Sequence, residues 1–113
     1  MQNAQLNHFQ KLDVYVVAKG LAVQVHRAKI RDAELRDQAL RASKSAFLQL
    51  AEGLPNYGVA MRRKYFICAR NSACEVAAAL DLAIELDAID REAGLEAIGT
   101  AVRLSALLGG LLR

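Results

Sequence analysis

The amino-acid sequence predicts an all-α protein, specifically an antiparallel up-down-up-down four-helix bundle. Four stretches of the chain repeat apolar residues at intervals of three and four, which is the spacing of one helical face. Of the 113 residues, 54% are hydrophobic, only 5% are aromatic and one is proline, a composition that disfavours an all-β domain. The connections between the four stretches are short, so consecutive helices are expected to be antiparallel neighbours.

A chain of this length is typical of one domain, which we place over residues 1–113 with a flexible N-terminal segment over residues 1–11. Such a domain buries about two-thirds of its unfolded surface and needs neither a disulfide nor a metal to fold. The polar start predicts no signal peptide, and no uninterrupted apolar run reaches the roughly 18 residues of a membrane span. We therefore expect a cytoplasmic protein.

The first two predicted helices each present one apolar face. The helix over residues 12–29 carries on that face Val14, Val17, Ala18, Leu21, Val25 and Ala28. Val16 and Val23 lie roughly opposite, so each is either exposed alone or in contact with another surface. The helix over residues 33–53 carries Leu35, Ala39, Ala42, Ser43, Ala46, Leu50 and Leu54. Gly53 predicts the end of this helix, because glycine adopts the left-handed conformation that often closes a helix.

The third predicted helix, over residues 59–86, has an apolar arc of about 180°, wider than the roughly 100° that one bundle face needs. We expect the excess to face another subunit, with these interface candidates: Met61, Tyr65, Cys68, Val76, Ala79 and Ala83. The alternative is that a small bundle encloses its longest helix more fully. Asp90 is the expected N-cap of the fourth helix, over residues 91–112. The apolar side of that helix is marked by Leu95, Ile98, Val102, Leu108 and Leu112.

Positive charge is concentrated in the first two-thirds of a chain whose net charge is +3. Residues 1–75 hold 12 Lys and Arg against 6 Asp and Glu, whereas residues 76–113 hold 3 against 6. Near the start of the third helix, the helix dipole disfavours cations by up to about 1 kcal/mol each. Four residues at and beyond this point are our candidates for contact with the phosphates of RNA or DNA: Arg62, Arg63, Lys64 and Arg70. The alternative is a solvated basic face that keeps the protein soluble.

The sequence contains no pattern typical of an enzyme, a metal site or a cofactor site. His8 and His26 have no Cys or paired carboxylate at helical spacing, and no Gly-rich phosphate loop follows a strand. Cys68 and Cys74 lie too far apart along one helix for a disulfide and are expected to be small core thiols. Glu52, at the end of the second helix, is expected to be structural. It can form an exposed pair with Arg62 or Arg63, or a buried pair with Arg41 or another helix. We therefore expect no catalytic residues, no metal and no cofactor.

Six segments, spread in order over nearly the whole chain, form a recognisable set. They are Phe9–Tyr15, Gln38–Ala42, Leu50–Gly53, Tyr65–Ala69, Ser72–Glu75 and Leu108–Leu112. The set resembles the four-helix-bundle family first noted in intervening sequences of bacterial large-subunit ribosomal RNA genes. This sequence departs from the family pattern after Gly53, where a basic, Gly-rich segment is usual and Leu54–Gly58 stands here.

The resemblance implies a small, bacterial, cytosolic four-helix bundle for which no catalytic residues are established. Relatives form ring-shaped homopentamers. A more distant branch resembles the accessory variability protein of diversity-generating retroelements, which binds nucleic acid and partners a reverse transcriptase. We therefore expect a non-enzymatic homo-oligomer, with a pentamer favoured, that binds RNA or DNA through a basic surface and does not contact a membrane. The alternative is a protein–protein adaptor or scaffold that touches no nucleic acid.

Overall fold

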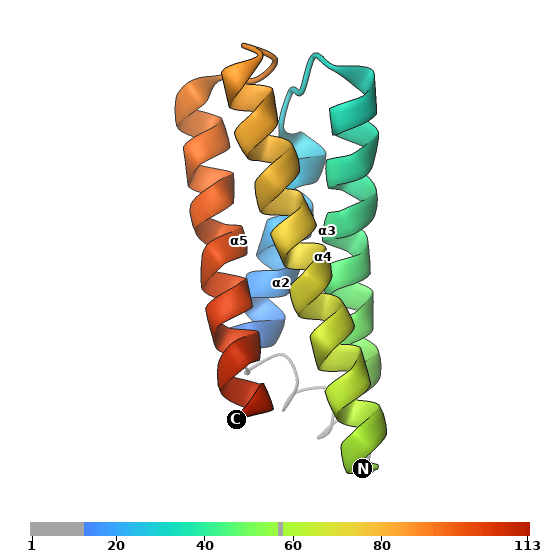
Figure 1. Ribbon diagram of the computed structural model, residues 1–113. Coiled ribbons are helices and arrows are strands. Elements are labelled where there is room, and N and C mark those ends of the chain that lie inside the picture. The colour runs from blue at the N-terminus through green and yellow to red at the C-terminus, as the bar shows by residue number, and fades with distance from the viewer. Residues whose placement is uncertain (1–12, 57) are drawn as a thin grey trace.

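The computed structural model describes residues 13–56 and 58–113, and every regular element in these ranges is a helix. The helices are α2 (Asp13–Arg27), α3 (Ala33–Gly53), α4 (Val59–Glu85) and α5 (Arg91–Leu112). They run alternately up and down (Figure 1), which confirms the predicted all-α four-helix bundle. The flexible segment predicted over residues 1–11 lies outside the described residues.

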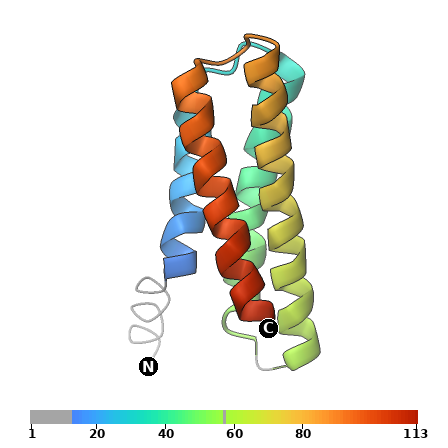
Figure 2. The same cartoon turned by 60° about the vertical axis from the view of Figure 1, so that its left-hand side comes forward.

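The four helices form a square in which sequence neighbours are also neighbours in space. α2 and α4 each pack against α3 and α5, so α2 lies diagonally opposite α4 (Figures 1 and 2). α4 has 27 residues and α2 has 15, so α2 covers only part of the length of the bundle. The longest dimension of the fold is 47 Å, close to the length of α4 itself.

Hydrogen bonds outside the regular helices cap the helix starts and join two of the loops. The Asp90 carboxylate accepts a hydrogen bond from the Ala93 amide at 3.0 Å, which confirms the predicted N-cap of α5. Asp32 caps α3 in the same way. At one end of the bundle, the Arg31 amide donates to the Ala88 carbonyl at 2.7 Å. This bond ties the α2–α3 connection to the α4–α5 connection.

The predicted core faces of α2 and α3 are confirmed, but the face of α5 is partly wrong. Leu95 and Val102 are 50% and 58% exposed, and the core side of α5 is formed instead by Gly94, Ala97, Ala101, Leu104 and Leu108. The reason is a close approach, because a Cβ at position 94 would lie 2.7 Å from Cγ1 of Ile84 on α4. Packing the small residues of α5 inward turns its bulkier residues toward solvent.

Gly53 also serves close packing rather than a special backbone conformation. No glycine in the described ranges has a positive φ, so the predicted left-handed conformation at Gly53 is wrong. Gly53 is the last residue of α3, and a Cβ there would lie 2.9 Å from both Tyr65 Cβ and Phe66 Cε1. The glycine is required because α3 and α4 approach each other closely at this point.

Candidate nucleic-acid interface

The three consecutive cations of α4 are exposed at the end of the bundle where α5 also ends. Arg62, Arg63 and Lys64 lie in the first two turns of α4. Figure 2 shows the C-terminal end of α5 beside these turns. The first turn of α4 contains no acidic residue, and Gly58 provides no side-chain cap for it. The positive end of the helix dipole therefore adds to the positive charge of the side chains.

Backbone carbonyl groups orient two of these cations without neutralising them. Arg62 Nε donates a hydrogen bond to the Asn56 carbonyl at 3.1 Å, and Arg63 Nη1 donates to the Leu112 carbonyl at 2.6 Å. A guanidinium has five N–H donors, so each arginine keeps donors available for a ligand. Within residues 13–56 and 58–113, no carboxylate lies within 4.0 Å of any of the three cations.

Glu52 does not supply the ion pair that the sequence suggested. Its side chain is exposed at the end of α3, and the ion pair of the described chain joins Arg36 to Asp37 at 4.0 Å. The expected pairing of Glu52 with an arginine of α4 is therefore absent from the described part of the structure. The positive charge at the start of α4 consequently remains uncompensated by a direct carboxylate contact.

Arg70 is a weaker candidate for ligand contact than the consecutive cations. It is half-buried and lies seven residues, or about 10 Å along α4, from Arg63. A shallow surface hollow of about 420 Å³ includes Arg63 but is not lined by Arg70. The hollow is lined by Ala60, Arg63, Lys64, Ile67 and Cys68. The structure thus places two of the predicted cations on a concave surface and leaves Arg70 beside it.

The predicted interface residues on α4 divide into two groups. Met61 is 47% exposed, and Tyr65 and Cys68 are half-buried, so these three retain surface for a partner. The other three, Val76, Ala79 and Ala83, are 0%, 6% and 0% exposed and face the core of their own bundle. The prediction is wrong for these three, because α3 and α5 together cover both flanks of the apolar arc of α4. The more complete enclosure of the longest helix, considered above, explains them.

An unpartnered apolar surface lies instead on the outer face of α5. Leu95 and Val102 share this face with Gly99, Ala106 and Gly110, all exposed and uncharged. The intervals between these five residues are four, three, four and four, close to the period of a helix–helix seam. The exposed large apolar side chains of neighbouring α4 are Val59, Met61, Ile67 and Leu82, and Leu86 follows at its C-cap. The sequence placed Leu95 and Val102 on the apolar side of this helix, and only the structure shows that they lie on an exposed face.

The structure also locates the cysteines and the apolar character of α5. Cys74 is exposed and Cys68 is half-buried, so the expectation of two core thiols is wrong, most clearly for Cys74. No group of three or more His, Cys, Asp or Glu residues that could hold a metal occurs in the described ranges.

α5 is long and apolar enough to cross a membrane by length and composition alone. One such helix is weak evidence, since helices of soluble bundles pass the same test.

Comparisons with known proteins place the fold in a context. A family model described as 23S rRNA-intervening sequence protein matches residues 10–110. A crystal structure from Bacteroides thetaiotaomicron, described as a protein with unknown function from the S23 ribosomal protein family, is similar with a TM-score of 0.82. The two sequences are 20% identical, and the match covers 88% of this chain and 98% of the other. No curated protein matches the chain.

Proposed function

Because the chain belongs to the 23S rRNA-intervening sequence protein family, we propose that it is a non-enzymatic, homo-oligomeric helical bundle that binds RNA. The observation that carries the RNA proposal is the group Arg62, Arg63 and Lys64. These three cations are exposed, two of them are oriented by backbone carbonyls, and no described carboxylate neutralises them. Such cations attract phosphate groups, and their attraction is multiplied when several subunits present the same patch.

Assembly is proposed through the outer face of α5. Leu95 and Val102 lose contact with water only if another surface covers them, and burial of apolar area stabilises association by about 25 cal/mol per Å². The glycines and alanine between them permit close approach of a second helix. A pentamer is the state expected from the family resemblance, and assembly would bring several copies of the basic end into one particle.

RNA binding is tested by fluorescence anisotropy with a labelled single strand and a labelled stem, each as RNA and as DNA. We expect the affinity to fall steeply with salt, and the triple variant Arg62→Ala/Arg63→Ala/Lys64→Ala to bind at least tenfold more weakly with a shallower salt dependence. A matched triple variant, Lys29→Ala/Arg41→Ala/Lys44→Ala, removes the same charge from exposed positions elsewhere. Equal affinity of both triple variants would reject this site.

Assembly is tested by sedimentation velocity at micromolar concentration. The double variant Leu95→Glu/Val102→Glu is expected to sediment as the 12.3 kDa monomer with its helical content unchanged, because both side chains are outside the core. Leu48→Glu, at a 59% exposed position on α3, serves as the control and is expected to leave the assembly intact. A natural chain that is monomeric under these conditions would refute the proposal.

The alternative function is a protein–protein adaptor that does not contact nucleic acid. The uncharged outer face of α5 favours this reading if it is covered by a different protein instead of a second copy. A monomeric natural chain with no affinity for RNA or DNA would support it. The two functions are therefore separated by the same pair of measurements.

A further inference from the structure

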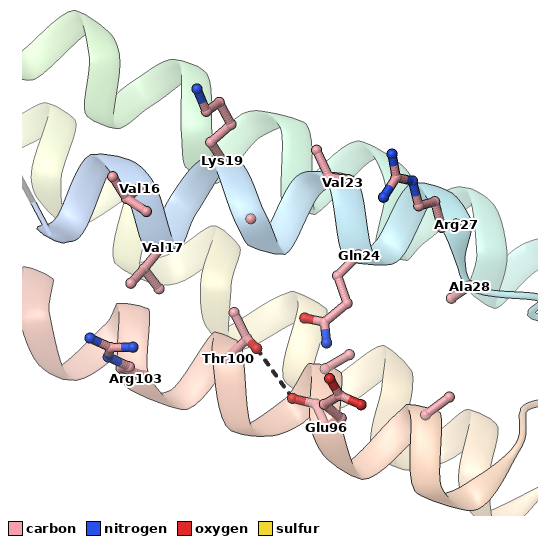
Figure 3. A pocket seen from close by; sticks show the side chains of 13 residues that line it. Val16, Val17, Lys19, Val23, Gln24, Arg27, Ala28, Glu96, Thr100 and Arg103 are labelled. Atoms are coloured by element: carbon pink, nitrogen blue, oxygen red, sulfur yellow. Dashed lines mark hydrogen bonds between the residues drawn. The ribbon is translucent and has the colours of Figure 1, made fainter. Parts of the chain in front are cut away.

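A second feature, independent of the RNA proposal, is a groove between α2 and α5. Its volume is about 830 Å³, and it follows α2 from Val16 to Ala28, a length of about 18 Å. Figure 3 shows α2 along one side and α5 along the other. The groove occurs on a different side of α5 from Leu95 and Val102, neither of which lines it.

The floor of the groove is apolar and closed. Val17 and Ala97 are 8% and 1% exposed, so the core closes the groove beneath them. The Thr100 hydroxyl donates to the Glu96 carbonyl at 3.2 Å and is therefore satisfied within α5. Gln24, which points from α2 toward α5, is the principal polar side chain between the two helices (Figure 3). The floor thus offers apolar contact and few hydrogen-bonding groups.

Small residues leave room above this floor. A Cβ built at Gly20 would meet no heavy atom within 4 Å, although the residue lines the groove. Val16 and Val23 are 51% and 41% exposed at its lip. These are the two valines that the sequence placed opposite the core face of the first helix. Their apolar surface stays in water unless something fills the groove.

The rims of the groove are basic. Lys19 and Arg27 lie on the α2 edge with their side chains pointing away from α5, and Arg103 lies on the α5 edge (Figure 3). Lys19 Nζ lies 5.6 Å from the centre of the Tyr15 ring. Glu96 is the one carboxylate of the lining, so the charged residues give the groove a net charge of +2. The α5 edge is balanced by Glu96 and Arg103, so the excess positive charge belongs to α2 and favours a ligand of net negative charge beside the apolar strip.

We propose that this groove binds an amphipathic α-helix of a partner protein, with an apolar face of about three turns flanked by Asp or Glu. The length of the groove matches about 12 helical residues, and the apolar floor matches the i, i+3, i+4, i+7 face by which helices dock into grooves. The basic rims select an acidic helix over a basic one. Nucleic acid fits less well, because the floor between the rims is apolar and one rim carries Glu96.

The segment 1–12 of the same chain is not the occupant that the charges favour. It contains no Asp or Glu and has one lysine, so it lacks the acidic flanks that the rims would attract. A second copy of this chain is a distinct outcome, which the experiment below separates by the sedimentation of Gly20→Met without peptide.

The probe is a fluorescein-labelled helical peptide of about 15 residues, with Leu and Ala on one face and Glu on both flanks. The control peptide has Lys in place of each Glu. Fluorescence anisotropy with the full chain is expected to show binding of the Glu peptide at least tenfold tighter than that of the Lys peptide. Gly20→Met, which fills the groove, is expected to weaken Glu-peptide binding at least tenfold. Gly109→Met, also in open space on α5 but outside the groove, is expected to leave it within twofold.

A charge-reversal variant provides a second readout that does not depend on filling the groove. Arg27→Glu/Arg103→Glu is expected to invert the preference, so that the Lys peptide binds more tightly than the Glu peptide. Circular dichroism melting checks the fold, and Gly20→Met is expected to melt no lower than the natural chain, since glycine is a poor helix former.

Five results would overturn the proposal. Four come from the peptide assay: equal binding of the two peptides by the natural chain, equal loss in the two glycine variants, displacement of the peptide by single-stranded RNA, and peptide binding that appears only after deletion of residues 1–12. A change in sedimentation caused by Gly20→Met without peptide would assign the groove to a second copy and would also overturn it.

Discussion

In Gly53→Ala, higher helix propensity should stabilise the fold, whereas the added Cβ should destabilise it by overpacking. The structure predicts that the overpacking is the larger effect on the free energy of unfolding. Alanine is favoured over glycine in a helix by about 0.5–1 kcal/mol, and less at the last residue. However, the added Cβ would lie 2.9 Å from Tyr65 Cβ and from Phe66 Cε1. Tyr65 Cβ is fixed to the backbone of α4, and Phe66 is only 4% exposed, so neither atom can move aside freely. Overpacking of this kind costs about 1–3 kcal/mol.

The net expectation is a loss of about 1–2 kcal/mol in the free energy of unfolding. This corresponds to a melting temperature lower by about 5–10 °C in a domain of this size. The assay is urea unfolding followed by circular dichroism at 222 nm, at one fixed protein concentration because assembly changes apparent stability. Gly20→Ala is the matched control: its Cβ meets nothing within 4 Å, so it is expected to gain about 0.5–1 kcal/mol.

A Gly53→Ala variant as stable as the natural chain would refute the packing argument. It would mean that α3 and α4 separate by a few tenths of an ångström at little cost. A loss of stability in Gly20→Ala would show that alanine does not stabilise these helices relative to glycine. The assumed contribution of helix propensity would then be refuted.

Three further predictions, two of them with a control variant, test other parts of the fold by the same unfolding assay. Gly94→Ala should cost less than Gly53→Ala, because the two nearest atoms are Cγ1 and Cδ1 of half-buried Ile84, which can change rotamer, and buried Ile89 Cγ2 is farther away at 3.2 Å; an equal or larger loss would contradict this. Leu80→Ala should cost about 2–5 kcal/mol, since Leu80 is fully buried, whereas Leu48→Ala should stay within about 0.5 kcal/mol; similar losses would contradict the assigned core. Asp90→Ala should cost about 1 kcal/mol through loss of the α5 cap, and Asp90→Asn should retain most of it.

The sequence was sufficient for the fold class and for most helix boundaries. α3 and α5 span the residues that periodicity and end signals indicate, and α2 and α4 differ by one or two residues at their ends. This succeeds because helix hydrogen bonds are local and because an apolar stripe at a period of 3.6 residues can be buried by one bundle face. The consecutive cations of α4 were also found from sequence, since the position of a charge within a helix follows from the boundaries alone.

Only the tertiary structure decided which of two apolar faces on one helix is buried in the core and which is exposed. Leu95 and Val102 have the hydropathy of core residues, yet they are exposed because α5 buries Gly94, Ala97 and Ala101 instead, with Gly94 in close approach to α4. The sequence predicted that Val76 faces another subunit, but α3 and α5 pack on both sides of α4 and bury it completely. The groove between α2 and α5 likewise arises from two helices 60 or more residues apart in the chain. The sequence pattern shows how apolar each helix face is. Which face is buried depends on how closely two helices can approach, and the smallest side chains set that distance.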